Sequence, residues 1–511
     1  MSLSRSAPNL FVASIIAGFF LVGIVLIVIL GAVTGLSFLI AGTWGAMLIG
    51  HPKRVLLFYW CWATVGPYFH TLYPSMLTVW GDEMLIALML GILLTHHIRA
   101  RIHLPELRVV RRVLLGLAAL ILLSAFANRV PSKLVFHFCL QYMRFFLLVY
   151  YTYYFLSARD LKAVVLTIVG LFLLQFIVNM GWLFHVNPMP NWMGGPDFAI
   201  GSGLGANIVA YFAIAVICLA VAYIRRSARA SQKALGVILL VVALVQLYFS
   251  FTFHAYMICA ACVVFQLWLV PAPLHTRFAQ AGMAGLAAVV VVALALALPG
   301  SHAVKTLLRP DFVKYRWRDM VDGPKGQSYK NSIYYLPKDL PYPIIGGGPG
   351  NVGSMVARLN RRPLADRYFN WVAMSVEVRE LTHSGSISAA PTTGLLTLWT
   401  ELGPLGMLLY WGVQAYAAMR VGWAVRRGRY KGRYKRILAE AFTPTMMMLL
   451  GLNVLTDYAF IAFMNGGIWI WAACVWTPEE SEVPPSARMT DVVEPSDVWR
   501  KVLAERAPVK A

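Results

Sequence analysis

The sequence predicts an all-α polytopic membrane protein with about 14 transmembrane helices, and three observations support this prediction. First, 59% of the 511 residues are hydrophobic and only 13% are charged, whereas a soluble chain has about 25% charged residues. Second, the hydrophobic residues form many runs of roughly the 20 residues that a helix needs to cross a bilayer. Third, the positive charges gather in alternate connections between these runs, as the positive-inside rule requires.

The hydrophobic runs define the predicted spans in chain order. The first run follows Arg5 and is too long for the apolar part of a cleaved signal peptide, so we take it as a transmembrane helix. Two of the later spans are separated only by a short break at His254. The predicted spans are 11–31, 33–50, 55–73, 80–96, 112–127, 134–156, 163–184, 204–224, 234–252, 254–270, 278–298, 393–419, 437–456 and 459–476.

The basic connections predict the orientation in the membrane. If Arg5 lies in the cytoplasm, every second connection should be basic. The chain follows this pattern, so both termini are predicted to be cytoplasmic, and the polar tail 478–511 is predicted to be a flexible extension. Because orientation accounts for most of the net charge of +22, nucleic acid is not expected as a partner. The basic connections contain Lys53 and Arg54, 99–112, 159–162, 225–233, Arg277 and 420–436.

The six cysteines lie in hydrophobic runs, and none of them lies in a long polar segment. Cys259 and Cys262 have the spacing of a metal-binding pair, but no second pair of Cys or His accompanies them. We therefore expect the cysteines to pack in the core, without a metal or a disulfide.

One connection is much longer than the others. It divides the chain into 1–298 with eleven spans, the loop 299–392, 393–477 with three spans, and the tail. The loop is predicted to lie on the outer side and, because long unstructured segments are uncommon, to contain short helices. It carries 13 Lys and Arg against seven Asp and Glu. Since long loops escape the positive-inside rule, this charge indicates either a solvated lid or a site for an anionic ligand at the membrane surface.

Arginines and glycines of the loop bear on the second interpretation. Arg316 and Arg318 offer planar guanidinium groups suited to phosphate oxygens, as do the arginines of 358–362, although surface positions on an amphipathic helix also explain them. The glycine run GGGPGN at 346–351 permits close approach of its backbone to another group. It lacks the GK[ST] sequence of a phosphate-binding P-loop, and a simple turn also explains it.

Two further segments accompany the glycine run. The stretch TGLLTLWTELGPLG at 393–406 opens the helix that follows the large loop, and the stretch GLGAN at 203–207 opens an earlier helix. In kind and order these three segments resemble motifs of the O-antigen polymerase and O-antigen ligase superfamily. The resemblance covers roughly residues 200–425, and the first 200 residues match this family only in hydropathy.

The resemblance implies a GT-C-like membrane fold and a metal-independent glycosyltransferase. Such an enzyme lies in the bacterial inner membrane, with its large loop in the periplasm, and needs no cofactor. Its donor is an oligosaccharide on undecaprenyl pyrophosphate, and its acceptor is a sugar hydroxyl of another glycan. Membrane lipid surrounds it, and chain-length regulator and export proteins are further candidate partners.

The resemblance also assigns candidate catalytic residues. Arg316 and Arg318 match the arginine that holds the pyrophosphate, whose negative charge grows as it leaves. His383 resembles the family's histidine, which would orient or deprotonate the acceptor hydroxyl, although a loop histidine can also be structural. His383 precedes Glu401 by 18 residues, a longer spacing than the family's, with 385–391 as a candidate insertion.

Other residues are candidates for binding the pyrophosphate or the glycan. Arg144 lies within a span, so it needs either a carboxylate on another helix or an anionic substrate. His254 stands where many family members have an arginine, and a packed or interfacial position also explains it. Asp82 and Glu83 are interpreted as residues of a helix N-terminus, favoured by its dipole. The candidate binding residues are Arg144, His254, Asn207, Gly348, Gly350, Asn351, Arg379 and Glu401.

The sequence leaves three functions open. A polymerase, which is the function that we expect, would join lipid-linked repeat units of an exopolysaccharide or O-antigen. A ligase would use the same donor and move the finished glycan to the lipid A core. A lipid-linked oligosaccharide flippase or another transporter also has many spans. Transporters often contain repeated halves, however, and this chain has one dominant loop and no evident repeat.

Overall fold

The structure is a computed structural model that describes residues 51–72, 76–97, 105–185, 205–250, 253–270, 282, 310–311, 314, 321, 324–354, 356–357, 360–375, 393–455 and 465–477. Every regular element within these residues is helical, and η2 is a π-helix. The elements are α3 (Pro52–Leu72), α4 (Met76–His97), α5 (Pro105–Ala127), α6 (Ser132–Tyr142), α7 (Phe146–Phe155), η1 (Ala158–Asp160), α8 (Leu161–His185), α9 (Gly205–Arg226), α10 (Ala230–Phe249), α11 (Phe253–Leu269), α15 (Pro324–Lys330), η2 (Asn331–Tyr335), α16 (Leu336–Asp339), η3 (Pro343–Ile345), α18 (Pro363–Ser375), α20 (Gly394–Arg426), α21 (Arg433–Leu455) and α22 (Gly467–Trp476).

Several of these helices are suited to a membrane. Within the described residues, five are long and apolar enough to cross it, or six if the bent pair α6 and α7 is counted as one span. The five are Leu107–Ala127, Ala158–Met180, Ile208–Arg226, Ala230–Phe249 and Arg433–Val454. The prediction of a helical membrane protein is therefore confirmed. The total of about 14 spans and the GT-C-like arrangement stay predictions, because 11–31, 33–50 and nearly all of 278–298 lie outside the described residues.

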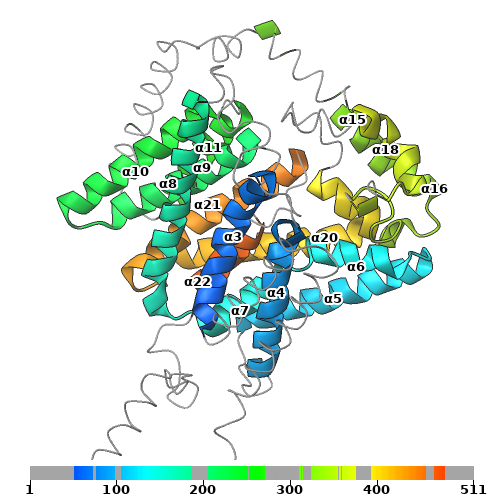
Figure 1. The fold of residues 1–511 in the computed structure, drawn as a ribbon, viewed down its shortest axis with the longest axis horizontal. Helices are drawn as coiled ribbons and strands as arrows, with labels where there is room; N and C mark the ends of the chain where they lie inside the picture. Colours follow the sequence, from blue (N-terminus) through cyan, green and yellow to red (C-terminus); the bar gives the residue numbers. More distant parts are fainter. Residues whose placement is uncertain are drawn as a thin grey trace, which may run out of the picture.

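The centre of the bundle is formed by α9 and α21. In each, 78% of the apolar stretch is buried, against 28% in α5 and α10. Helix α21 packs against α9, α11, α20 and α22, and α22 also packs against α7 (Figure 1). Helices α5 and α10 expose large apolar side chains, among them Leu115, Leu122 and Ile238. An apolar helix with such an outer face is suited to contact with lipid.

The span predicted over 134–156 consists of two helices. Helices α6 and α7 meet at an angle of 49°, and the turn at 143–145 joins them. The bent pair matches the predicted span if it is counted as one span, so a single crossing by these residues stays a prediction. Sharp bends are usually caused by proline or glycine, and 132–155 contains neither. The turn instead contains Arg144, which binds carboxylates of α4.

Short helices occupy the described part of the loop 299–392, as expected. They are α15, η2, α16, η3 and α18, and Figure 1 shows α15, α16 and α18 together at one end of the bundle, beside α5, α6 and α20. We call this the loop end. The loop has a small core of its own, formed by Leu336, Leu340, Val352, Tyr368 and Phe369.

Two tyrosine hydroxyls form hydrogen bonds that connect the loop helices to one another and to α21. The Tyr329 hydroxyl of α15 donates to the carbonyl oxygen of Val454 in α21 and lies 3.4 Å from Thr393 Oγ1, next to the start of α20. Burial raises the pKa of Tyr329, so this hydroxyl keeps its proton at neutral pH. The Tyr368 hydroxyl of α18 donates to the Asp339 carboxylate of α16. The Tyr329 contacts hold α15 beside the start of α20 and the end of α21, and the Tyr368 contact joins α18 to α16.

Candidate functional site

The glycine run lies where the helices α5, α6 and α20 meet. Gly347 N donates to Thr400 O at 2.9 Å and Gly348 N donates to Glu401 O at 3.0 Å, which joins the run to α20. The run also lies close to α6, since a Cβ atom added at Gly350 would be 3.0 Å from the carbonyl oxygen of Leu134. Two of the predicted binding residues thus contact the bundle, Gly348 through α20 and Gly350 through α6.

The C-terminal end of α5 forms the third side of this site. Ser124 Oγ donates to Ile345 O at 2.7 Å, and Asn128 Nδ2 donates to Gly346 O at 3.0 Å. We call this meeting of 345–354 with α5, α6 and α20 the junction. Residues from positions 124 to 401 come together there, at the loop end of the bundle.

The Glu401 carboxylate is the centre of the junction. Its side chain is fully buried and accepts backbone N–H groups from Asn351 at 2.8 Å, Val352 at 3.1 Å and Ser354 at 2.7 Å. Successive backbone N–H groups that converge in this way form a nest that binds an anion. Here the anion is a side chain of the protein. Asn351 and Glu401, both predicted to bind substrate, are therefore in contact with each other, and their role towards a substrate stays a prediction.

Two glycines allow the backbones of the glycine run and α20 to touch. Gly346 has φ 74° and ψ −174°, and Gly403 has φ 68° and ψ −177°, a region that only glycine adopts readily. A Cβ atom at Gly403 would lie 2.1 Å from the carbonyl oxygen of Ile344. Gly403 and Pro404 interrupt the helical geometry of α20 just after Glu401, because proline cannot donate the helical hydrogen bond.

Replacing Gly403 with alanine is expected to lower the free energy of unfolding by at least about 2 kcal/mol, because it adds both backbone strain and a clash with Ile344. The matched control is Gly412→Ala in the same helix, where a Cβ atom would meet nothing within 4 Å. This control should be neutral or slightly stabilising, since alanine favours helix. Thermal unfolding in detergent measures both variants. Equal unfolding midpoints for the two variants would contradict the close contact at Gly403.

The end of α5 carries an arginine in an unusual backbone conformation. Val130 N donates to Ala125 O and Arg129 N donates to Phe126 O, which is the Schellman arrangement that ends many helices. The left-handed position in this motif usually holds glycine, and here it holds Arg129 with φ 50°. This placement costs of order 1–3 kcal/mol. A cation is thus held, at a cost in stability, at the loop end.

Arg129 lines an open trough of about 760 Å³ between the ends of α5 and α6. The walls are mostly apolar, and Phe126 is 87% exposed while Phe136 is 61% exposed. Tyr342, next to the glycine run, forms part of the rim. We call this space the arginine trough; its lining residues are Leu122, Ala125, Phe126, Ala127, Arg129, Val130, Ser132, Val135, Phe136 and Tyr342. Its size and lining suit an amphiphile with an anionic head.

Arg144 belongs to a different cluster. It forms ion pairs with Asp82, at 2.9 Å, and with Glu83, and its side chain is only 8% exposed. This is the carboxylate partner on another helix that one of the two interpretations requires. The interpretation of Asp82 and Glu83 as N-terminal residues was wrong, because α4 begins at Met76 and has no acidic residue in its first turn. Their contact with Arg144 gives them a different role, since a charge inside a membrane span needs a partner.

The remaining predicted residues are placed only in part. Arg316, Arg318, Arg379 and His383 lie outside the described residues. Asn207 and His254 lie in the first turns of α9 and α11, and their side chains also lie outside. The structure thus brings together Gly348, Gly350, Asn351 and Glu401, whereas Arg144 binds Asp82 and Glu83.

Sequence reasoning missed several residues of the junction. Ser124 and Asn128 were not selected, although their spacing of four residues at the end of a predicted span places both on one helix face. Arg129 was not selected as a site residue either. Arg362 was identified as a candidate for phosphate, and its Nε donates to Asn351 Oδ1 at 2.8 Å. A cation of the loop therefore contacts the glycine run directly.

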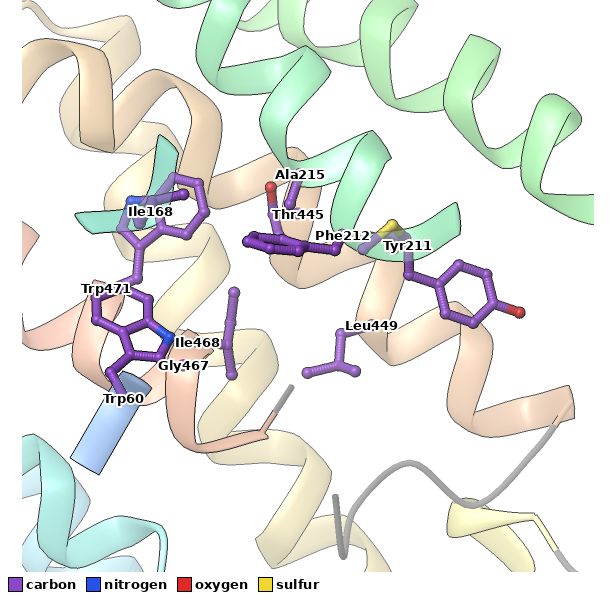
Figure 2. Close-up of a pocket in the computed structure, with 11 residues that line it drawn as sticks. Trp60, Ile168, Tyr211, Phe212, Ala215, Thr445, Leu449, Gly467, Ile468 and Trp471 are labelled. Carbon is purple, nitrogen blue, oxygen red and sulfur yellow. The ribbon is translucent and has the colours of Figure 1, made fainter. Parts of the chain in front are cut away.

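A smaller cavity lies inside the bundle, among α3, α8, α9, α21 and α22 (Figure 2). Its volume is about 50 Å³, and apolar side chains such as Ile168, Phe212 and Leu449 line it, with the indole rings of Trp60 and Trp471 on one side. Such a space holds a few waters at most. It is too small and too apolar for a sugar, so the loop end remains the candidate site.

No protein-family model matches the chain, and no curated protein matches its sequence. The likeness to a glycosyltransferase family therefore rests on the motifs themselves. Residues of two of these motifs, the glycine run and the start of α20, meet in the junction.

Proposed function

We propose that the chain polymerises lipid-linked repeat units of an exopolysaccharide or O-antigen. In this reaction a glycan passes from undecaprenyl pyrophosphate to a sugar hydroxyl of an acceptor glycan, without a metal, at the periplasmic face of the bacterial inner membrane. The observation that carries the proposal is the arginine trough beside the junction. Its apolar walls suit a polyprenyl chain, and Arg129 suits the phosphate at the end of that chain.

In the proposed reaction the protein forms no covalent bond to the substrate. Its main contribution is positive charge that stabilises the leaving pyrophosphate. The acceptor oxygen forms a bond to the anomeric carbon, the bond from that carbon to the pyrophosphate oxygen breaks, and the acceptor proton passes to a base. Arg129 would stabilise the leaving pyrophosphate, together with Arg316 or Arg318, and His383 would take the proton. The buried Glu401 would hold the glycine run in place and remain outside the chemistry, since its carboxylate accepts three backbone N–H groups.

Deleting the gene distinguishes the proposed polymerase from its alternatives. We expect single repeat units on the lipid carrier to accumulate and to be accessible to reagents that label only the outer face of the membrane. Mass spectrometry of extracted lipid-linked glycans measures their length. Long glycans left on the carrier would indicate a ligase instead, and single units protected from the outer reagent would indicate a flippase.

Replacing Arg129 with alanine is expected to slow polymerisation by about 100-fold, because one preorganised donor to a developing negative charge is worth roughly that much. Purified protein in detergent, incubated with lipid-linked repeat units from the deletion strain, should produce a ladder of longer glycans on a gel. The control Lys133→Ala removes an exposed cation at the start of α6 that does not line the trough, and it should leave the ladder unchanged. A normal ladder from the Arg129 variant would remove the trough from the proposed site.

A further inference from the structure

A second candidate site lies away from the loop end, where α20 is connected to α21. We call this connection, together with the adjoining end of α9, the basic end. The segment 420–440 contains eight Lys and Arg but one Glu, and 225–233 contains four Lys and Arg without an acidic residue. Such charge orients a membrane protein, but orientation alone does not require the cations to surround a cavity.

A cavity of about 140 Å³ is present at the basic end. Two of its lining residues are arginines, Arg226 of α9 and Arg436 of α21. The connection around it turns at Gly428 and Gly432, which have φ 64° and 70°. The complete lining is Arg226, Val425, Gly428, Tyr430, Arg436 and Glu440.

The acidic residue of the lining is already neutralised. The Glu440 side chain is only 1% exposed and is paired with Arg226. Arg436 Nε donates to the carbonyl oxygen of Tyr430 at 2.7 Å, which is a neutral group and leaves the charge of Arg436 uncompensated by that contact. The cavity therefore combines a compensated ion pair with an additional, exposed cation, and its net charge favours an anion.

Aromatic residues indicate the depth of this cavity in a bilayer. The Arg426 guanidinium lies 4.8 Å from the ring centre of Trp268, and that of Arg427 lies 3.5 Å from Trp423. Both indole rings are exposed, by 51% and 60% respectively. Exposed tryptophans are typical of the headgroup level of a membrane. Met419 is 65% exposed and lies one turn before Trp423 on α20, so this helix has an exposed apolar face next to the basic end.

We propose that this cavity binds the headgroup phosphate of an anionic phospholipid, held by Arg436 and Arg226. Basic pockets between membrane helices are suited to such headgroups, and the phosphodiester is large enough to fill the cavity together with water. This inference does not depend on the glycosyltransferase proposal, because it concerns the opposite end of α20.

Binding of phosphatidylglycerol to the full-length protein tests the inference. We expect native mass spectrometry to detect phosphatidylglycerol bound in preference to phosphatidylcholine. We also expect phosphatidylglycerol, but not phosphatidylcholine, to raise the unfolding midpoint in detergent. Arg436→Gln should weaken phosphatidylglycerol binding about fivefold, as expected for one basic residue at a membrane surface. Arg436 is exposed, so this variant should fold, and Arg436→Lys should recover part of the binding because it keeps the charge.

The control is Arg429→Gln, which removes an exposed cation of the same connection that does not line the cavity. It should bind phosphatidylglycerol as the unmodified protein does. An equal loss in both variants would mean that diffuse charge attracts the lipid, which overturns the proposed cavity site. Inorganic phosphate that raises the midpoint as much as the lipid, and does so only when Arg436 is present, would reassign the cavity to a soluble anion. Equal binding of phosphatidylcholine would also overturn the proposal.

Discussion

Replacing Glu401 with alanine is expected to lower the free energy of unfolding by at least about 3 kcal/mol. The substitution leaves the backbone N–H groups of Asn351, Val352 and Ser354 buried without their acceptor, and each such group costs about 1–3 kcal/mol. We further expect the glycine run to separate from α20. Thermal unfolding in detergent measures the first effect, and protease cleavage within 324–375 measures the second.

Two further variants sharpen the interpretation of Glu401. Glu401→Gln keeps one carbonyl oxygen for two of the three N–H groups, so we expect a smaller loss of stability than with alanine. Asp366→Ala removes an exposed carboxylate of α18 and should change the unfolding midpoint little. If Glu401→Ala has the same unfolding midpoint and the same rate of protease cleavage as the Asp366 variant, the carboxylate does not hold the junction together.

The same variants separate a positioning role from a direct role in chemistry. If Glu401 acts only by holding the glycine run, the activity of Glu401→Gln per folded molecule should decrease in proportion to the increase in protease cleavage within 324–375. A complete loss of activity in a glutamine variant that resists protease as well as the unmodified protein would show that the carboxylate itself takes part in the reaction. This comparison tests the earlier expectation that Glu401 contacts substrate.

Hydropathy predicted the C-terminal ends of many helices, because a polar residue follows the last apolar residue where the helix ends. The predicted end at 127 for one span coincides with the end of α5, and the next residue, Asn128, bonds the glycine run instead of continuing the helix. The starts were predicted less well. Helix α5 begins at Pro105 and includes Arg108, Arg111 and Arg112, so it extends beyond the apolar stretch. Hydropathy indicates the depth of a residue in the membrane, and a helix can continue into the headgroup layer.

The contacts of the candidate site could not be predicted in this way. Glu401 accepts hydrogen bonds from backbone N–H groups about 50 residues earlier in the chain, and a hydropathy pattern contains no information about such pairs. The glycine run indicated that its backbone lies close to another group, but the sequence did not identify that group. A side-chain carboxylate and a phosphate both satisfy a nest of N–H groups. The choice between them depends on the tertiary structure.

Replacing Arg144 with methionine is expected to cost about 3–5 kcal/mol of stability, the usual penalty for removing one partner of a buried ion pair. The side chains of Asp82 and Glu83 are only 18% and 22% exposed, so their charges would remain in a poorly solvated place. Arg144 also lies in the bend between α6 and α7, and we expect the angle of 49° to relax in the variant. Thermal unfolding measures the loss of stability.

A triple variant separates the two interpretations of Arg144. Replacing Arg144 with methionine, Asp82 with asparagine and Glu83 with glutamine removes all three charges, and we expect it to recover most of the lost stability. If Arg144 serves only to compensate the two carboxylates, glycan polymerisation should return along with stability. If Arg144 also holds the pyrophosphate, the triple variant should be as stable as the unmodified protein and yet fail to produce a glycan ladder. Since Arg144 already forms ion pairs with two carboxylates in this structure, we expect the activity to return.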